Sequence, residues 1–173
     1  MGGGGPPASR AADVLAVEML LWRHAEAAAG DPDLARPLTE RGRRQAERMA
    51  RFLAPRLPKE LRIIVSPARR AQETARTLGR SFETEDLIAP GAGVTDILRA
   101  AGWPSSKRPV LVVGHQPTLG EVAAQLVEGR LPGWDFGTGA VCWLKGRSRK
   151  ISGGAGVLLA IEPEILERGE PAG

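Results

Sequence analysis

The stretch LLWRHAEA, residues 20–27, joins the end of a short apolar run to an arginine and a histidine. The apolar run, residues 17–22, has the length of a strand and little alternation, so it predicts a strand buried on both faces. Two similar runs follow, RIIV at 62–65 and VLVV at 110–113, with helical patterns between them. Alternating strands and helices predict an α/β fold: one three-layer domain, with a mostly parallel central sheet and helices on both faces.

The helices are predicted from their first residues. Thr39 is a favourable N-cap for a helix that runs to about Leu53. Ser66 followed by Pro67 predicts an N-cap and a first helical residue, opening a helix to about Gly79. The remaining predicted elements are a helix over 94–101, a helix from a Thr118/Glu121 capping box to about Glu128, and a closing strand pair over 140–144 and 157–161.

The length of 173 residues suffices for one domain. We expect residues 1–16, rich in glycine and proline, to be a disordered extension, residues 17–164 to form the domain, and residues 165–173 to be a tail. The net charge is +4, but the arginines are spread along the chain, which indicates solvated helix faces. The single cysteine, Cys142, lies in an apolar run and predicts an inert core thiol.

The same sequence indicates the compartment and the assembly. A lone cysteine rules out an internal disulfide and fits a reducing compartment. No apolar run approaches the roughly 20 residues of a membrane span, and the first residues lack the features of a signal peptide. We therefore expect a cytoplasmic monomer without a membrane partner.

Both histidines of the chain directly follow a predicted buried strand, His24 after the first and His115 after the third. The second strand is followed by SPARR, which ends in Arg69 and Arg70. Because the carboxyl ends of parallel strands lie at one edge of a sheet, we expect these side chains and Arg23 to share one crevice. A positioned neutral imidazole can attack phosphorus, and guanidinium groups neutralise the phosphoryl oxygens. The pattern therefore predicts a site for phosphoryl transfer.

Other kinds of site are disfavoured by the residues present. Two histidines without a clustered cysteine, aspartate or third histidine fall short of a zinc site, so we expect no metal. The chain has no Walker phosphate-binding loop. The basic segment at residues 145–150 has neither an aromatic platform nor a known module behind it, so we expect no nucleic-acid partner.

Four blocks of the sequence resemble those of the histidine phosphatase superfamily. LLWRHAEA resembles its Arg-His-Gly signature, with Ala25 where glycine is usual. RPLTERGRRQAERMARFL, IIVSPARRAQETA and VLVVGHQPTLGEVA resemble the next three blocks, in the same order, and the match spans residues 19–161. The short chain is most similar to the SixA-type protein-phosphohistidine phosphatases, which lack the insertions of phosphoglycerate mutases. The resemblance implies the phosphoglycerate mutase-like fold.

The resemblance also implies a role for each matching residue. His24 is the nucleophile, and Arg23 and Arg70 bind the phosphoryl oxygens. His115 completes the pocket as a hydrogen-bond donor to the phosphate. Arg69 precedes the matching arginine and is expected to point to solvent.

Two further residues are candidates for binding the substrate. Glu26, two residues after the nucleophile, could orient a partner or relay a proton, and Thr138 could line the mouth of the pocket. The implied reaction needs neither metal nor cofactor: the imidazole of the nucleophile takes the phosphoryl group, and water then hydrolyses the phosphohistidine enzyme.

The choice of substrate depends on the leaving group. Superfamily members that act on phosphoesters use an acidic residue from a mid-chain insertion, but here residues 84–103 are short and their acids, Glu85, Asp86 and Asp96, match no such motif. This favours phosphohistidine in a protein. The alternatives are a small phosphorylated substrate, such as a phosphoester or nucleotide, and a non-catalytic module that binds phosphate or phosphoproteins.

Overall fold

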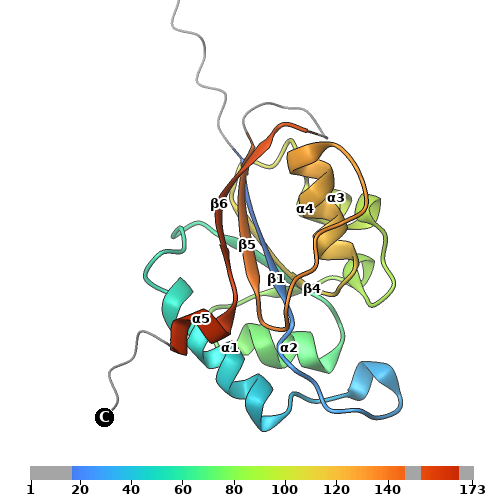
Figure 1. The fold of residues 1–173 in the computed structure, drawn as a ribbon, viewed down its shortest axis with the longest axis vertical. Helices are drawn as coiled ribbons and strands as arrows, with labels where there is room; N and C mark the ends of the chain where they lie inside the picture. Colours follow the sequence, from blue (N-terminus) through green and yellow to red (C-terminus); the bar gives the residue numbers. More distant parts are fainter. Residues whose placement is uncertain (1–16, 147–152, 168–173) are drawn as a thin grey trace, which may run out of the picture.

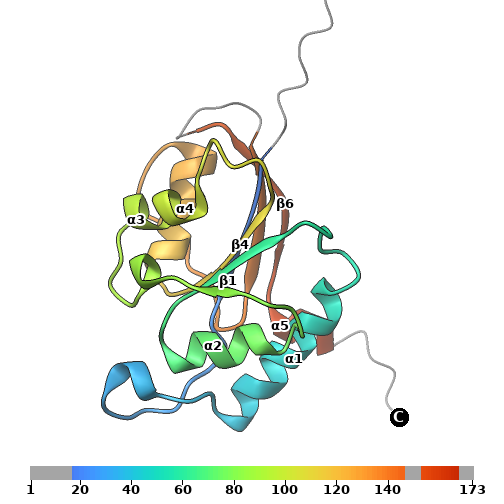
Figure 2. The same cartoon turned by 180° about the vertical axis from the view of Figure 1, so that it is seen from behind.

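The computed structural model describes residues 17–146 and 153–167, in which six strands form one sheet in the order β3-β2-β4-β1-β5-β6 (Figures 1 and 2). The first four of these run parallel, whereas β5 is antiparallel to β1 and β6 to β5. The predicted mostly parallel sheet is confirmed. The strands are β1 (Glu18–Arg23), β2 (Arg62–Val65), β3 (Glu83–Thr84), β4 (Val110–Gly114), β5 (Val141–Gly146) and β6 (Ala155–Ile161).

Helices cover both faces of the sheet (Figures 1 and 2). Alternate residues of β1 point to opposite faces. Leu20 and Trp22 pack with α1 and α2, whereas Met19 and Leu21 pack with α3 and α4. The helices are α1 (Glu40–Leu53), α2 (Arg69–Arg76), α3 (Val94–Ala101), α4 (Thr118–Glu128) and α5 (Pro163–Glu167), with short 3₁₀ turns η1 (Asp33–Ala35) and η2 (Asp86–Ile88).

The first turn of α1 forms as predicted and packs closely on the segment after β1. Thr39 is its N-cap, and the Oγ1 of Thr39 accepts a hydrogen bond from the backbone N–H of Gly42 at 2.9 Å. A Cβ atom at Gly42 would lie 1.9 Å from the carbonyl oxygen of Glu26. Only glycine lets the helix approach this carbonyl, so α1 lies against the residues that follow the nucleophile candidate.

The predicted start of the second helix is wrong. α2 begins at Arg69 rather than at Pro67, its N-cap is Ala68, and it ends at Arg76 rather than Gly79. Ser66 therefore does not cap the helix. Its side chain turns instead toward the end of β4, where it belongs to the site described below.

The capping box predicted at the start of α4 does not form either. The helix begins at Thr118 as predicted, but the preceding residue, Pro117, occupies the N-cap position and has no side chain that can cap. The first turn is capped instead by Gln116, whose Oε1 accepts from the N–H of Gly120 at 2.8 Å. The Oγ1 of Thr118 donates to the carbonyl oxygen of Ala92 at 2.7 Å, across to the segment before α3. The hydroxyl group that the sequence pattern predicted to cap the helix is therefore hydrogen-bonded to a tertiary partner instead.

The folded chain continues past residue 164, where the sequence predicted the C-terminal tail to begin. α5 extends to Glu167, and its Leu166 packs against the apolar core on the α1 side of the sheet. The predicted extension at 1–16 and most of the basic segment at 145–150 lie outside the described residues. Among the helices that the structure describes, none is long and apolar enough to span a membrane.

Cys142 is buried in the core, as predicted. It stands in β5, and burial raises the pKa of its thiol to about 12. The thiolate, which is the reactive form of a cysteine, is therefore suppressed at neutral pH.

Candidate active site

The ends of β1, β2 and β4 lie side by side at one edge of the sheet. In the register of these parallel strands, Arg23 pairs with Gly114 and Val65 pairs with Val113. Ligand sites in such sheets lie beyond the carboxyl ends of the strands. The residues that follow the three strand ends are His24, Ser66 and His115.

The imidazole of His24 is held in one tautomer. Its Nδ1 lies 2.8 Å from the carbonyl oxygen of Ala25, which can only accept, so Nδ1 carries the proton. The lone pair of Nε2 therefore accepts from the Nε of Arg70, 3.3 Å away. Ala25 is fixed in turn, because its N–H donates to the Oγ1 of Thr74 at 3.0 Å. No described non-glycine residue has a positive φ, so alanine fits this position without strain.

Burial and neighbouring positive charge keep both imidazoles neutral. Burial lowers the pKa of His24 from 6.5 to about 4, with the hydrogen bond to Ala25 opposing this shift and the charge of Arg70 adding to it. Burial, followed by the charges of His24 and Arg70, lowers the pKa of His115 to about 3. The two ring centroids are 5.1 Å apart. At neutral pH, His24 thus keeps the bare Nε2 that attack on phosphorus requires.

Of the two adjacent arginines that begin α2, Arg70 contacts the nucleophile candidate His24. Its side chain is 5% exposed. Arg69 is exposed and forms an ion pair with Glu73, one helical turn further along, at 2.7 Å. This is the placement that the resemblance implied for the two residues.

Arg70 also binds a carboxylate that sequence reasoning missed. Its Nη1 donates to the carbonyl oxygen of Asp33 at 2.8 Å, and its Nη2 donates to the Oδ2 of Asp33 at 3.0 Å. The second carboxylate oxygen pairs with Arg36 at 2.9 Å. Hydrogen bonds from Arg36 and then Arg70 hold the pKa of Asp33 below its usual range. Asp33 lies in a loop without periodic pattern, so no sequence signal placed it beside the histidines.

Two buried nitrogen atoms at the site have no partner within the described residues: the Nε of Arg23 and the Nδ1 of His115. The Nη1 of Arg23 donates to the carbonyl oxygen of Phe136, and the Nε2 of His115 lies 2.7 Å from the Oγ of Ser66. Burial lowers the pKa of Arg23, against the opposing charge of Asp135. Because buried polar groups are seldom left unsatisfied, these nitrogens suit the oxygens of a bound oxyanion.

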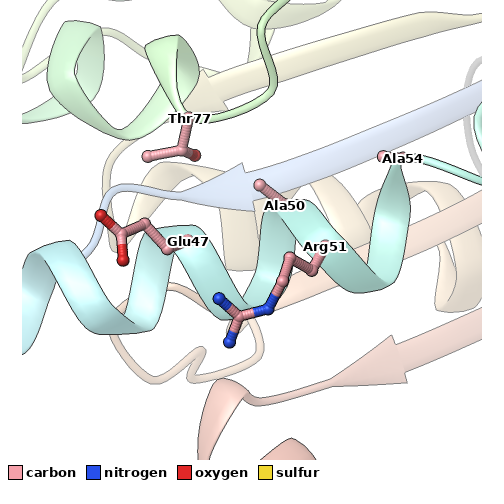
Figure 3. Close-up of a pocket in the computed structure, with 5 residues that line it drawn as sticks. All are labelled: Glu47, Ala50, Arg51, Ala54 and Thr77. Atoms are coloured by element: carbon pink, nitrogen blue, oxygen red, sulfur yellow. The ribbon is translucent and has the colours of Figure 1, made fainter.

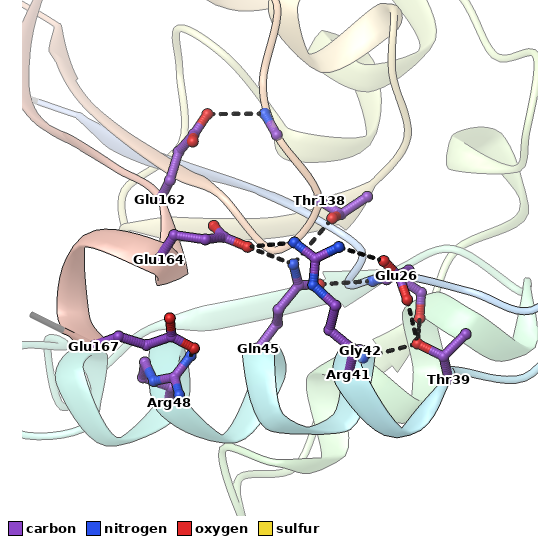
Figure 4. Close-up of polar contacts among 11 residues, drawn as sticks. Glu26, Thr39, Arg41, Gly42, Gln45, Arg48, Thr138, Glu162, Glu164 and Glu167 are labelled. Carbon is purple, nitrogen blue, oxygen red and sulfur yellow. Dashed lines mark hydrogen bonds and ion pairs between the residues drawn. The ribbon is translucent and has the colours of Figure 1, made fainter.

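The other two predicted substrate-binding residues lie in a second polar region, which we call the α1 cluster (Figure 4). The Oε1 of Glu26 accepts from Thr39 at 2.7 Å, and its Oε2 pairs with Arg41 at 2.9 Å. Gln45, which is buried, donates to the Oγ1 of Thr138 at 3.2 Å and accepts from the N–H of Glu26 at 3.0 Å. The partners of both predicted residues are thus on α1 or at its N-cap.

A separate cavity of about 420 Å³ lies between α1 and the end of α2 (Figure 3). None of the predicted site residues lines this cavity, so it is distinct from the cluster of residues at the strand ends. Its lining residues are Glu47, Ala50, Arg51, Ala54 and Thr77. In the part of the chain that the structure describes, no three His, Cys, Asp or Glu side chains gather to hold a metal ion.

Known proteins resemble this chain in sequence and in structure. The model of the histidine phosphatase superfamily (branch 1) matches residues 19–92. The phosphohistidine phosphatase SixA homolog of Haemophilus influenzae is 32% identical over 136 residues, which cover 67% of this chain and 80% of that protein. Phosphohistidine phosphatase SixA of Escherichia coli is 29% identical over 125 residues, which cover 67% of this chain and 78% of that protein.

The structural similarity extends over most of the chain. The structure of the protein histidine phosphatase SixA complexed with tungstate has a TM-score of 0.71 and 26% identity. The match covers 87% of this chain and 99% of that one. With its sheet order, its paired strand-end histidines and these relatives, the chain belongs to the histidine phosphatase superfamily.

Proposed function

We propose that the protein is a metal-independent phosphatase that dephosphorylates phosphohistidine in proteins, with His24 as the nucleophile. The observation that carries this proposal is the tautomer of His24, whose Nδ1 proton is held by Ala25 while its bare Nε2 faces Arg70. Two relatives bear the name phosphohistidine phosphatase SixA or SixA homolog. The similar structure of a SixA protein histidine phosphatase was solved with tungstate, a tetrahedral oxyanion like phosphate.

In the first step, the Nε2 of His24 attacks phosphorus, and the bond from phosphorus to the nitrogen of the substrate breaks. A phosphohistidine that is protonated on its second ring nitrogen leaves as a neutral imidazole. The guanidinium groups of Arg23 and Arg70 neutralise the oxygens of the transferred group, and His115 donates a hydrogen bond to it. The product is a phosphohistidine on the enzyme.

In the second step, water attacks phosphorus and the bond to the Nε2 of His24 breaks. The water supplies the fourth oxygen of inorganic phosphate, and its protons pass to the phosphate and to solvent. The ring of His24 returns to its starting tautomer, because its Nδ1 proton stays with the carbonyl oxygen of Ala25 throughout.

The carboxyl groups of Asp33 and of the mid-chain segment favour an imidazole over an alkoxide leaving group. Asp33 is the carboxyl group on Arg70, and its lowered pKa leaves it without a proton to donate at neutral pH. In the mid-chain segment, the carboxylate of Glu85 accepts from the backbone N–H of Leu87, and that of Asp96 accepts from the backbone N–H of Gly93. An alkoxide needs a positioned acid, whereas a protonated imidazole leaves without one.

A comparison of two substrates tests the proposal. We expect kcat/KM for a phosphohistidine peptide to exceed that for a sugar phosphate by about 10²–10⁴-fold, the usual contribution of a positioned acid. Activity should survive EDTA, and His24→Ala serves as the inactive control. Equal or faster turnover of the sugar phosphate would instead support a small phosphoester as substrate. Binding of both substrates without turnover would support a non-catalytic module, and loss of activity on chelation that a divalent ion restores would overturn metal independence.

A further inference from the structure

Ser66 stands at the end of β2, directly beside the end of β4. Its N–H donates to the carbonyl oxygen of Val113 at 3.0 Å, and its own carbonyl oxygen accepts from the side chain of Gln72 at 2.8 Å. Ser66 is fully buried, and its Oγ lies 2.7 Å from the Nε2 of His115. The backbone contacts on both sides thus aim this hydroxyl at the second histidine of the site.

The count of protons fixes the direction of this hydrogen bond. The Oγ of Ser66 accepts from the N–H of Ala68 at 3.2 Å, and the Nε2 of His115 is the one acceptor for its proton among the described residues. A neutral imidazole carries one proton. If Nε2 of His115 held that proton, both the buried hydroxyl proton of Ser66 and the lone pair of Nδ1 would lack a partner among the described residues. If Ser66 is the donor, the ring proton of His115 resides on Nδ1, and this N–H is the single group of the pair left without a partner.

We propose that Ser66 is a positioning residue, which donates to the Nε2 of His115 and thereby makes the Nδ1–H of His115 the donor to the phosphoryl group. This inference rests on the proposed function for the identity of the bound group. The Nδ1 of His115 is buried and has no partner in the described part of the chain. Bound substrate supplies the oxygen that this proton needs.

The two histidines then carry the same tautomer but use it in opposite ways. A backbone carbonyl holds the Nδ1 proton of His24, so its free nitrogen is a bare Nε2 that can attack phosphorus. A hydroxyl covers the Nε2 of His115, so its free nitrogen is an N–H that can donate to an oxygen. If the proton of His115 were on Nε2 instead, its Nδ1 would present a lone pair to the phosphoryl oxygens. The site would then have one hydrogen-bond donor fewer.

Nuclear magnetic resonance of the histidine rings tests the tautomer directly, because the chain has only two histidines. In protein labelled with ¹⁵N-histidine, we expect both rings of the wild type to carry their proton on Nδ1 at neutral pH. Addition of inorganic tungstate should shift the Nδ1 resonance of His115. A proton on the Nε2 of His115 in the wild type, or no shift with tungstate, would overturn the proposal without reliance on any variant.

Three variants separate positioning from general packing. Ser66→Ala should leave the ring of His115 as a mixture of tautomers, while His24 stays unchanged. Thr118→Val removes another buried hydroxyl, which donates to the backbone carbonyl of Ala92 rather than to a histidine. This variant is the matched control and should leave both rings as in the wild type. Ser66→Thr keeps the hydroxyl and should keep the Nδ1 proton. A single Nδ1–H tautomer that persists in Ser66→Ala would contradict the assignment.

The kinetic effect should appear mainly in kcat, because the donor acts on charge that develops during transfer. We expect Ser66→Ala to lower kcat/KM by about 10–100-fold, the loss typical when the partner that orients a metal-binding histidine is removed. Wild-type activity in Ser66→Ala would overturn the positioning role. Wild-type protein that shows the expected ring protons but does not turn over phosphohistidine would overturn the proposed function and leave the assignment of the tautomer intact.

Discussion

His24 and Glu26 are two residues apart, yet their side chains belong to two polar regions of opposite construction. The site at the strand ends holds two neutral imidazoles, and buried nitrogens there lack partners among the described residues. In the α1 cluster, the carboxylate of Glu26 and the amide of Gln45 have their partners within the fold. This contrast agrees with the proposal that the first region receives a group from outside, whereas the contacts of the second region hold parts of the chain together.

Removal of the proposed nucleophile should have the most severe consequence for activity. His24→Ala should abolish turnover, because no other described side chain presents a neutral nucleophilic nitrogen to Arg70. Wild-type protein quenched rapidly during turnover should contain an acid-labile, base-stable phosphoenzyme, and the variant should contain none. A His24→Ala protein that still turns over substrate would show that the region at the strand ends does not supply the nucleophile.

The neighbouring residues Arg69 and Arg70 should differ in their effect on activity, although they are adjacent in the chain. Arg70→Ala should lower kcat/KM by on the order of 10³-fold, by analogy with arginines that stabilise phosphoryl transfer. Arg69→Ala breaks only an exposed ion pair with Glu73, which contributes about 0–1 kcal/mol to the free energy of unfolding. Steady-state kinetics of the two variants provides the measurement. Equal losses in the two would mean that the burial of Arg70 has no bearing on catalysis.

Acidic pH should act on the first region. The folded-state pKa values of His24 and His115 are lowered from 6.5 to about 4 and about 3, so both rings should titrate in those ranges by nuclear magnetic resonance. Below pH 6.5 the histidines of the unfolded chain become protonated, whereas those of the native protein stay neutral. As the pH is lowered, the free energy of unfolding should therefore decrease by up to about 1.4 kcal/mol per pH unit per histidine, until the native rings titrate. Ring titration near pH 6.5 in the folded protein would contradict the burial argument.

The smallest effect on activity is expected from the α1 cluster. Thr138→Val removes the hydrogen bond from Gln45 and should lower the free energy of unfolding by about 0.5–1.5 kcal/mol. Glu26→Gln weakens a partly exposed ion pair with Arg41. In both variants kcat/KM should change by less than about threefold, equivalent to roughly 0.6 kcal/mol in the barrier. Denaturant unfolding measures the effect on stability, and steady-state kinetics measures the effect on activity. A tenfold loss of kcat/KM in either variant would indicate that the substituted residue contributes to substrate binding.

The central strands, and the meeting of their ends, could be predicted from the sequence because they depend on continuous apolar runs. The contacts of hydroxyl groups and loop residues with partners far away in the chain could not be predicted. The runs 17–22, 62–65 and 110–113 identify the central strands, and the parallel arrangement brings their ends together without further information. Ser66 and Thr118 have the residue types of N-caps, but His115 and Ala92 lie 49 and 26 residues away in the chain and take their hydroxyls. The capping preference of a residue type depends only on its neighbours in the chain, so it cannot predict such distant partners.

Loop residues lie further still beyond prediction. Asp33 reaches Arg70 from η1, and neither apolar spacing nor a family block marks it. Glu26 is close to His24 in the chain, which suggested a shared site, but its carboxylate contacts Thr39 and Arg41. The close approach of α1 at Gly42 draws the segment after β1 toward the helix, and the carboxylate of Glu26 goes with it.

The buried thiol of Cys142 makes the protein convenient for site-directed labelling. It is the only cysteine of the chain, and its pKa of about 12 suppresses reaction with maleimides or methanethiosulfonates. A cysteine introduced at exposed Leu34, in η1, would then be the one accessible thiol of ordinary reactivity. A fluorophore or spin label there would report directly whether η1, with its carboxylate on Arg70, changes position when an oxyanion binds.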